Sequence, residues 1–271
     1  TVTVSNITKG GADAGNYVLS TTTATALANI TPRILNLSGT RVYDTSTSIF
    51  SAGLTLGNLV SGESLGLFGT GNTSSKNVGS YNGSNFALGS LALSNGAGGL
   101  ASNYTLVGGA DTYTITPATL NVINTTADSK VYDANTIAAL HNAKLDGVLG
   151  SDTVDLTNAD VGTFSDKNVG TNKSVSTAMG IAGTDAGNYT LVQPANVLAD
   201  ITSKLIHVDA NGVSKVYDGT NASGATLSSQ DLAGGDQVTF NDTSNLFDTK
   251  DVGTGIVVRV GNSILDASIR T

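Results

Sequence analysis

Three acidic side chains recur at one position of the chain, each directly after a glycine or a serine: Glu63, Asp152 and Asp236. Two carboxylates about 5–9 Å apart across a cleft could hydrolyse a glycosidic bond if one of them had a raised pKa. The three acids lie far apart in the sequence, one in each of three similar stretches of the chain. The nearby Asp155 has no acidic counterpart in the other two stretches. The sequence therefore predicts no catalytic residue and no enzyme activity.

Two loops are rich in oxygen atoms, and both read Asp-Ala-Gly-Asn. They offer Asp13, Asn16, Asp185 and Asn188 as candidate calcium ligands. Calcium takes six to eight oxygen ligands, and neither loop has the alternating acids of a dedicated calcium loop. We expect each loop to be a turn whose Asn leads into a strand, with bound calcium as the alternative and no other cofactor.

Nitrogen and sulfur ligands are scarce. Cysteine is absent, which excludes disulfides, thiolate metal sites and thiol catalysis. His207 falls at an outward polar position of its segment, and His141 lies in a stretch that reads as a loop. Two imidazoles do not complete a zinc site, so we expect no zinc.

A Tyr-Asp pair occurs once in each segment: Tyr43-Asp44, Tyr132-Asp133 and Tyr217-Asp218. Such a pair could hold a ligand. Its recurrence instead favours a strand that ends in a turn, with the carboxylate accepting a hydrogen bond from the backbone amide two residues later.

A lysine followed by Asn or Asp also recurs: Lys76-Asn77, Lys167-Asn168 and Lys250-Asp251. These are the residue types of intramolecular isopeptide bonds, but neighbours in sequence cannot form a useful cross-link. We expect a turn in which the glycine three residues after each lysine (Gly79, Gly170 and Gly253) adopts positive φ.

These motifs belong to a repeat about 85 residues long. Its boundaries are marked by Ile30, Ile115 and Ile201, which are 85 and 86 residues apart. A fixed period of this length indicates tandem small domains. We assign 1–31 to the C-terminal part of an upstream repeat, 32–116 to repeat 1, 117–202 to repeat 2, and 203–271 to an incomplete repeat 3.

Short strands account for the hydrophobic pattern. Apolar residues alternate with polar ones after each boundary and in the strands that contain Tyr17, Tyr104 and Tyr189, which we expect to point inward. Only 134–145 could form a turn or two of helix. We therefore predict an all-β chain of β-sandwich or β-grasp-like repeats. Boundaries such as Thr116-Pro117 leave no flexible spacer, which favours an elongated rod.

Composition limits the partners. Only 13% of the 271 residues are charged and the net charge is −8, so no basic face for nucleic acid is evident. No stretch of 18 apolar residues is present, so we expect no membrane insertion. Neighbouring repeats are the expected partners, and the truncated third repeat leaves a sheet edge through which chains could associate end to end.

Several motifs together resemble a known family. Lys130-Val-Tyr-Asp133, Asp166-Lys-Asn-Val-Gly170, Asp185-Ala-Gly-Asn-Tyr-Thr-Leu191 and Ile115-Thr-Pro117 are similar to the YDG and MBG-type repeats of bacterial hemagglutinin-like adhesins of the two-partner-secretion type. The resemblance implies a tandem all-β stalk on an extracellular, cell-surface protein. The Tyr-Asp-Gly triplet itself survives only at 217–219, with Thr45 and Ala134 at the third position of the other copies.

The functional expectation is a non-catalytic stalk segment of a bacterial surface or biofilm-matrix adhesin that supplies reach and stiffness. The alternative is an array of carbohydrate-binding modules that recognise matrix or host glycans. Such a face needs exposed aromatic residues, and Trp is absent from the chain.

Overall fold

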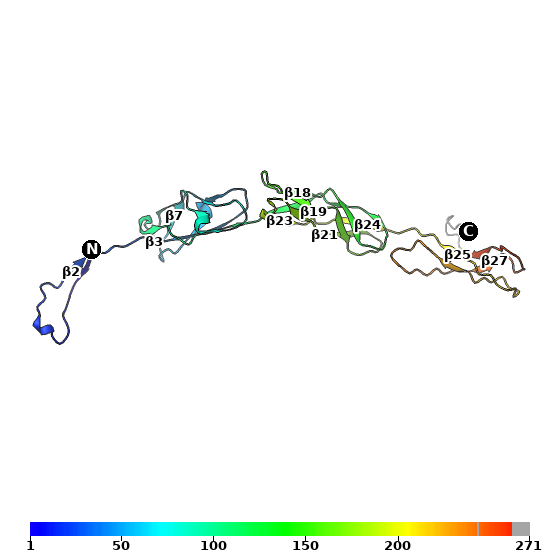
Figure 1. The fold of residues 1–271 in the computed structure, drawn as a ribbon, viewed down its shortest axis with the longest axis horizontal. Coiled ribbons are helices and arrows are strands. Elements are labelled where there is room, and N and C mark those ends of the chain that lie inside the picture. Colours follow the sequence, from blue (N-terminus) through cyan, green and yellow to red (C-terminus); the bar gives the residue numbers. More distant parts are fainter. Residues whose placement is uncertain (243, 262–271) are drawn as a thin grey trace. The chain divides into compact units, whose positions relative to one another are not determined.

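The computed structural model of the chain describes residues 1–242 and 244–261 (Figure 1). Among these residues the secondary structure consists of β-strands and short 3-10 helices, so the fold class is all-β. No helix in the described part is long and apolar enough to cross a membrane. The last ten residues of repeat 3, 262–271, lie outside the described residues.

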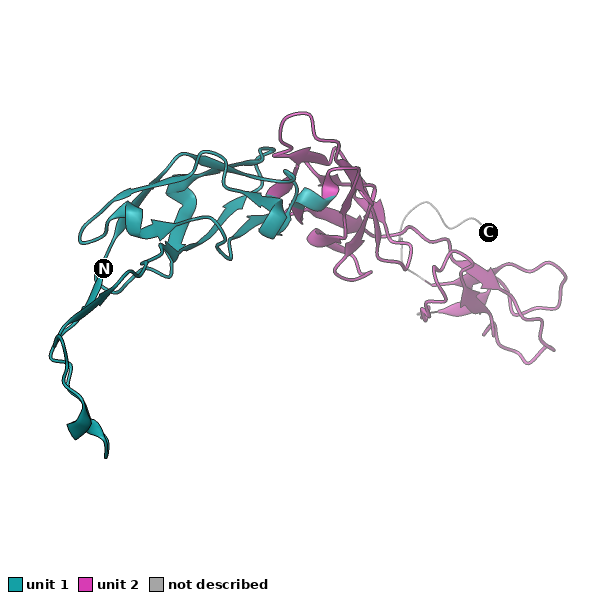
Figure 2. Ribbon diagram, turned by 60° about the vertical axis from the view of Figure 1, so that its left-hand side comes forward, with its two compact units in different colours: residues 1–118, 187–189 teal, residues 119–186, 190–271 magenta. Residues whose placement is uncertain are grey.

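The chain divides into two compact units (Figure 2). One comprises residues 1–118 and 187–189, and the other comprises 119–186 and 190–271. The first unit therefore contains repeat 1, and the second contains most of repeat 2 together with repeat 3.

Repeat 1 is built around a four-stranded sheet in the order β6-β4-β13-β9. Smaller sheets pair β10-β8-β5, β11-β7 and β12-β3. The strands are β3 (Arg33–Ile34), β4 (Asn36–Val42), β5 (Ser48–Phe50), β6 (Leu54–Gly57), β7 (Leu65–Phe68), β8 (Thr70–Thr73), β9 (Gly79–Asn82), β10 (Phe86–Ala87), β11 (Ala92–Asn95), β12 (Tyr104–Thr105) and β13 (Thr112–Thr116). The 3-10 helices are η2 (Ser51–Gly53), η3 (Gly83–Asn85) and η4 (Ala101–Asn103).

Repeat 2 follows the same plan, with a six-stranded sheet in the order β15-β17-β20-β21-β24-β16. Two further sheets have the orders β18-β14-β23 and β19-β22. The strands are β14 (Ala118–Ile123), β15 (Thr126–Ala127), β16 (Lys130–Val131), β17 (Ile137–His141), β18 (Lys144–Asp146), β19 (Asp155–Thr157), β20 (Val161–Phe164), β21 (Gly170–Thr177), β22 (Gly180–Ala182), β23 (Tyr189–Val192) and β24 (Leu198–Thr202), with η5 (Ala186–Asn188) between β22 and β23.

The expected helical turn at 134–145 is wrong. Residues 137–141 form β17, which pairs with β20 and β15. His141, which we expected in a loop, ends this strand. The Ala-rich composition favours helix, but Ala138 and Leu140 alternate into the core, and strand pairing outweighs the local preference.

In repeats 1 and 2 the last main-sheet strand runs parallel to an early strand of the same repeat. In repeat 1, Arg41 of β4 lies opposite Ile115 of β13. In repeat 2, Lys130 of β16 lies opposite Ile201 of β24. A parallel pair of this kind makes the chain enter a repeat at one end of the sheet and leave it at the other.

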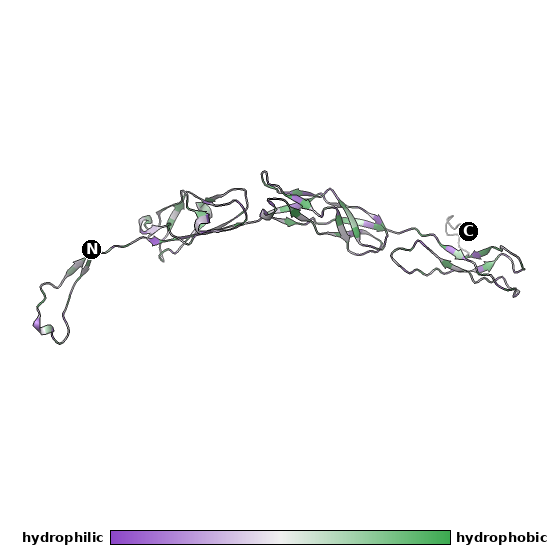
Figure 3. Cartoon of the chain, viewed as in Figure 1, coloured by the Kyte–Doolittle hydropathy of each residue, from purple (hydrophilic) through white to green (hydrophobic). Residues whose placement is uncertain are grey.

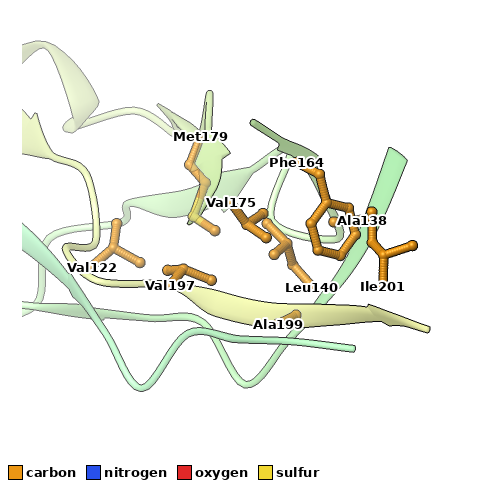
Figure 4. Close-up of a cluster of buried hydrophobic side chains, with 9 residues drawn as sticks. All are labelled: Val122, Ala138, Leu140, Phe164, Val175, Met179, Val197, Ala199 and Ile201. Atoms are coloured by element: carbon orange, nitrogen blue, oxygen red, sulfur yellow. The ribbon is translucent and has the colours of Figure 1, made fainter. Parts of the chain in front are cut away.

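The core is filled by apolar side chains that alternate with exposed residues along the strands, as the sequence predicts. Val197, Ala199 and Ile201 are at most 6% exposed, whereas Leu198 between them is 47% exposed. Figure 3 shows hydrophobic and hydrophilic residues interspersed along these strands. The buried cluster of repeat 2 is drawn in Figure 4 and comprises Val122, Ala138, Leu140, Phe164, Val175, Met179, Val197, Ala199 and Ile201.

The terminal segments are less complete. Residues 1–31 form a hairpin of β1 (Val2–Val4) and β2 (Ala24–Ala26) with η1 (Ala14–Asn16) between them. Tyr17, expected inside, is 68% exposed because the hairpin packs no second layer over it, whereas Tyr104 and Tyr189 are buried as predicted. Repeat 3 contributes β25 (Asp209–Asn211), β26 (Thr226–Ser228), β27 (Asn245–Phe247) and β28 (Val258–Val260).

Candidate functional site

Tyr43-Asp44 and Tyr132-Asp133 follow the ends of β4 and β16 in turns, as predicted, whereas Tyr217-Asp218 makes its turn outside any strand. Asp44, Asp133 and Asp218 each accept a hydrogen bond through Oδ1 from the amide two residues later, at 2.9, 3.1 and 2.9 Å. A basic residue three positions earlier completes each turn. Lys130 Nζ lies 2.8 Å from Asp133 Oδ1, and Lys215 Nζ lies 2.9 Å from Asp218 Oδ1. Hydrogen bonds and charge therefore lower the pKa of Asp218 to about 2, with the Lys215 contact as the largest cause.

The basic residue also covers an aromatic ring in two of the repeats. Lys130 Nζ lies 5.5 Å from the ring centroid of Phe164, and Lys215 Nζ lies 5.8 Å from that of Phe247. Repeat 1 has Arg41 at the basic position and Thr73 in place of the phenylalanine. Thr73 is buried and donates a hydrogen bond to the carbonyl oxygen of Ser75 at 2.7 Å.

The residue after each Tyr-Asp pair has left-handed backbone geometry. φ is +68° at Thr45, +64° at Ala134 and +77° at Gly219. Only glycine adopts this region without steric cost. The glycine of the Tyr-Asp-Gly triplet is thus the unstrained form of a turn that all three repeats make.

The expected positive-φ glycine of the lysine turn is wrong. Gly79 has φ +158°, which is close to fully extended, and neither Gly170 nor Gly253 has positive φ. Side chains form this turn instead, because the residue before each lysine accepts a hydrogen bond from the amide two residues later. Ser75, Asp166 and Thr249 do so at 3.2, 2.7 and 3.1 Å.

Repeats 2 and 3 meet, within the second unit, at a cluster of three polar side chains: Tyr132, Lys167 and Asp236. We call these residues the junction cluster. The hydroxyl of Tyr132 donates to Asp236 Oδ2 at 2.5 Å, and Lys167 Nζ donates to Asp236 Oδ1 at 2.9 Å. Lys167 Nζ also lies 5.9 Å from the centroid of the Tyr132 ring. Both oxygens of one carboxylate are thereby held by the preceding repeat.

These contacts stabilise the charged forms. The pKa of Asp236 is lowered, first by the hydrogen bond from Tyr132 and then by that from Lys167. The pKa of Lys167 is raised, mainly by its hydrogen bond to Asp236. The cluster therefore carries a carboxylate and an ammonium group at neutral pH, arranged as a structural ion pair.

The backbones also approach closely beside the cluster. A Cβ atom added to Gly234 would lie 2.5 Å from Cβ of Ala134. A groove of about 190 Å³ adjoins these residues. It is lined by Tyr132, Val169, Ser203, Lys204, Ile206, Asp231, Leu232, Ala233, Asp236 and Val238. Its small volume matches a packing seam and falls below the usual range for ligand pockets.

The first unit contains a lysine and a tyrosine that correspond to Lys167 and Tyr132 of the junction cluster. Lys76 Nζ lies 5.7 Å from the centroid of Tyr43, whose ring packs edge-on against Tyr189 with centroids 5.5 Å apart. Asn188 Oδ1 accepts from the amide of Val78 at 2.9 Å, and Asn188 Nδ2 donates to Asn77 Oδ1 at 3.2 Å. The lysine turn and the motif tyrosine therefore serve the same packing role in both units.

Two of the four candidate calcium ligands, Asp185 and Asn188, have side chains with other hydrogen-bond partners. Asn188 is buried and its oxygen is engaged by Val78, while Asp185 Oδ2 accepts from the amide of Thr153 at 3.0 Å. Asp13 directly precedes η1 and Asn16 ends it, in the terminal hairpin and far in sequence from Asp185 and Asn188. In the described residues no three His, Asp or Glu side chains gather into a metal-binding group.

The remaining chemical candidates are dispersed. Glu63 accepts a hydrogen bond from the hydroxyl of Tyr104, which raises the tyrosine pKa. His207 is on the surface as predicted, with Nε2 3.2 Å from Asp209 Oδ1. His141 Nε2 lies 2.8 Å from Asp128 Oδ2. Two of the three acids considered as hydrolase candidates, Glu63 of repeat 1 and Asp236 of repeat 3, thus accept hydrogen bonds from tyrosine hydroxyls.

Sequence reasoning missed the junction cluster. It treated each motif within its own repeat, whereas Tyr132 and Asp236 are 104 residues apart and belong to different repeats. The sequence did contain a signal for it. A tyrosine, a lysine and an acid each recur once per repeat, as they must if the same contact forms wherever two repeats meet.

Comparison with known proteins identifies the repeats. The YDG domain model matches three consecutive segments, residues 26–114, 116–197 and 202–268. No curated protein and no solved structure was found to match the chain. The three matches cover most of the sequence and contain the Tyr-Asp turns and the junction residues described above. The chain therefore belongs to the YDG domain family, as a tandem array of such domains.

Proposed function

We propose that the chain is a non-catalytic, structural stalk segment of a large bacterial surface or biofilm-matrix adhesin, located outside the cell. Its task is to hold successive repeats in fixed order and orientation, so that the array has reach and stiffness. The junction cluster is the observation that carries this proposal. A motif residue of one repeat, Tyr132, finds its hydrogen-bond partner in the next repeat, at Asp236.

Two features of the repeats support a stiff array. The parallel pairs β4–β13 and β16–β24 take the chain from one end of a repeat to the other. Pro117 alone separates β13 from β14, so the connection has almost no slack. Flexible Gly/Ser linkers would behave in the opposite way.

The adhesin assignment rests on the resemblance of the repeat motifs to hemagglutinin-like surface proteins. The partners we propose are neighbouring repeats and other copies of the chain. Glycan recognition receives less support, because Tyr43, Tyr104 and Tyr189 are each at most 6% exposed and cannot form a stacking face for sugars.

Small-angle X-ray scattering of the full chain tests the mechanical part. We expect the cross-section of a single β-domain and a maximum dimension close to that of three domains placed end to end. A double variant, Tyr132→Phe with Asp236→Ala, should broaden the distribution of distances, while Tyr17→Phe should not, because Tyr17 is exposed. A compact particle for the unmodified chain would overturn the proposal.

Surface labelling tests the cellular part. Antibodies raised against the chain should label intact bacteria that produce it, and protease added outside the cells should remove the label. Labelling that requires permeabilised cells would contradict the extracellular assignment. A glycan array probed with the full chain would then decide between a stalk and the carbohydrate-binding alternative.

A further inference from the structure

The main sheet of repeat 1, β6-β4-β13-β9, has one face on the core and one face turned outward. Leu37, Tyr81, Tyr113 and Ile115 point inward and are at most 7% exposed. The residues that alternate with them point to the opposite face, because successive side chains of a strand lie on opposite sides of the sheet. This outward face takes no part in the core of the repeat.

The register of the strands places polar residues in rows across the outward face. The first row runs from β6 through β4 and β13 to β9 and consists of Thr55, Ser38, Thr112 and Asn82. The second row lies two residues further along the strands and consists of Thr40, Thr114 and Ser80. All seven residues are uncharged, and all but the half-buried Thr114 are exposed. We call these seven residues the polar face.

The polar face has a regular spacing. Neighbouring strands lie about 4.8 Å apart, and residues on one face of a strand recur about every 6.7 Å. The face is therefore a two-dimensional array of hydroxyl groups with one side-chain amide at its edge. Because a hydroxyl group both donates and accepts a hydrogen bond, the array can pair with many hydroxyl groups arranged at a similar spacing.

The fold does not require hydroxyl groups at these positions. In repeat 2, β24 corresponds to β13, and its sequence LADIT at 198–202 aligns with TYTIT at 112–116. Leu198 and Asp200 therefore stand where repeat 1 has Thr112 and Thr114. Asparagine is also depleted in strands, so local propensity does not explain Asn82. The composition of the polar face is thus a property of repeat 1 for which neither the core nor the strands give a reason.

The chemistry of the polar face narrows the class of its partner. Nucleic acids and anionic membranes are bound through basic residues, and none of the seven residues is basic. The cores of protein interfaces are enriched in aromatic residues and arginine and depleted in serine, which is the opposite of this composition. A neutral ligand that carries many hydroxyl groups can pair with every residue of the face, and no charged group has to lose its water.

We propose that the polar face of repeat 1 binds a neutral, extended polysaccharide whose chain crosses the strands. The advance of one sugar along an extended β-linked chain is close to the spacing between strands, so successive sugars meet successive strands. A single hydrogen bond of this kind contributes little, and the affinity comes from many of them along one polymer. The contact needs no stacking aromatic residue. It goes beyond the stalk function, in which the polar face has no part.

Co-sedimentation of the full chain with insoluble cellulose and chitin, two neutral β-linked polysaccharides, tests the proposal. We expect at least one of them to retain the chain. Soluble hydroxyethyl cellulose should compete for the chain, whereas carboxymethyl cellulose, which has the same backbone and carries carboxylates, should compete far less. Thr112→Leu with Thr114→Asp gives repeat 1 the residues of repeat 2 and should weaken retention by about tenfold or more, because a carboxylate has to lose its water beneath the sugar chain.

Two further variants complete the experiment. Thr40→Asp, on β4 opposite Thr114, should weaken retention in the same way. Thr119→Asp, at an exposed position of β14 outside the polar face, is the matched control and should be retained like the unmodified chain. Circular dichroism verifies that each variant is folded, and an unchanged small-angle scattering profile separates a loss of binding from a loss of the stalk.

A chain that neither cellulose nor chitin retains would overturn the proposal, as would full retention of both face variants. Self-association of the chain that both face variants abolish would also overturn it, because the polar face would then be a contact between copies.

Discussion

The hydroxyl of Tyr132 and the carboxylate of Asp236 form a hydrogen bond of 2.5 Å between two repeats. Tyr132→Phe removes this bond and keeps the ring on which Lys167 rests. We expect the repeats themselves to stay folded and their mutual orientation to loosen. Hydrogen exchange monitored by mass spectrometry should show faster exchange around 231–236 in the variant. Tyr17→Phe serves as the control, and equal protection in both variants would contradict the role of the junction cluster.

The junction should weaken in acid. The pKa of Asp236 is lowered in the folded chain, so its contribution is fully present above the unfolded value near 3.8 and is lost as pH falls through the folded pKa. Scattering profiles should therefore change below about pH 4. Asp236→Asn should remove most of that dependence, and an unchanged acid response in this variant would place the transition elsewhere.

Ala134→Gly should stabilise repeat 2. Ala134 has φ +64°, which costs a residue with a Cβ atom about 1–2 kcal/mol, and glycine gives back part of this as unfolded-chain entropy. We expect an increase of up to about 1 kcal/mol in the free energy of unfolding, measured with urea. Ala139→Gly, within β17, is the control and should lower it by about 0.5–1 kcal/mol.

Phe164→Ala should be the most damaging single change in repeat 2. The ring is 2% exposed, belongs to the cluster of Figure 4, and supports Lys130. Loss of a buried aromatic ring costs about 3–5 kcal/mol. Phe68→Ala, at a residue that is 54% exposed, should cost far less in the same urea titration. Similar losses at both positions would show that the cluster is not the core of the repeat.

Asp111 is a buried carboxylate of repeat 1 whose pKa is raised by burial and lowered by a hydrogen bond. Burial raises its pKa, while Oδ1 accepts a hydrogen bond from the buried amide of Leu37 at 2.7 Å. A raised folded pKa means that its favourable contribution is present below the unfolded pKa and is lost as pH rises through the folded value. Asp111→Asn should keep the acceptor and be at least as stable as the unmodified chain at pH 7.

Asp111→Ala is the counterpart of that variant. It leaves the Leu37 amide without its acceptor and should cost about 1–3 kcal/mol in the free energy of unfolding. Urea titrations of both variants at pH 4 and pH 7 would check the order of stabilities. Equal stability of the Asn and Ala variants would show that the hydrogen bond contributes little.

The sequence predicts the local chemistry of the turns well. An Asp whose side chain reaches the amide two residues later needs only a few neighbouring residues, and all three Tyr-Asp pairs behave in this way. The prediction for the lysine turn was wrong. Hydrogen bonds to the side chains of Ser75, Asp166 and Thr249 form this turn, and no glycine with left-handed backbone geometry is needed.

Contacts between distant residues were beyond prediction. The ring under Lys130 belongs to Phe164, which lies outside the local motif that contains the lysine. Residues 137–141 were open to a helical reading until β20 and β15 on either side made them a strand. The strands themselves followed from alternation, since burial on one face is a local periodic signal.

The parallel pairing of β4 with β13 determines how repeat 1 responds to being pulled. Tension applied through the two ends of repeat 1 draws β4 and β13 past each other along their length. The hydrogen bonds between them, such as that from the Tyr43 amide to the Thr116 carbonyl at 2.8 Å, are then loaded in shear, all at once. Strands peeled apart from one end would break these bonds one by one at lower force. Repeat 1, and repeat 2 through its β16–β24 pair, should therefore resist extension when the pull is transmitted along their own backbone.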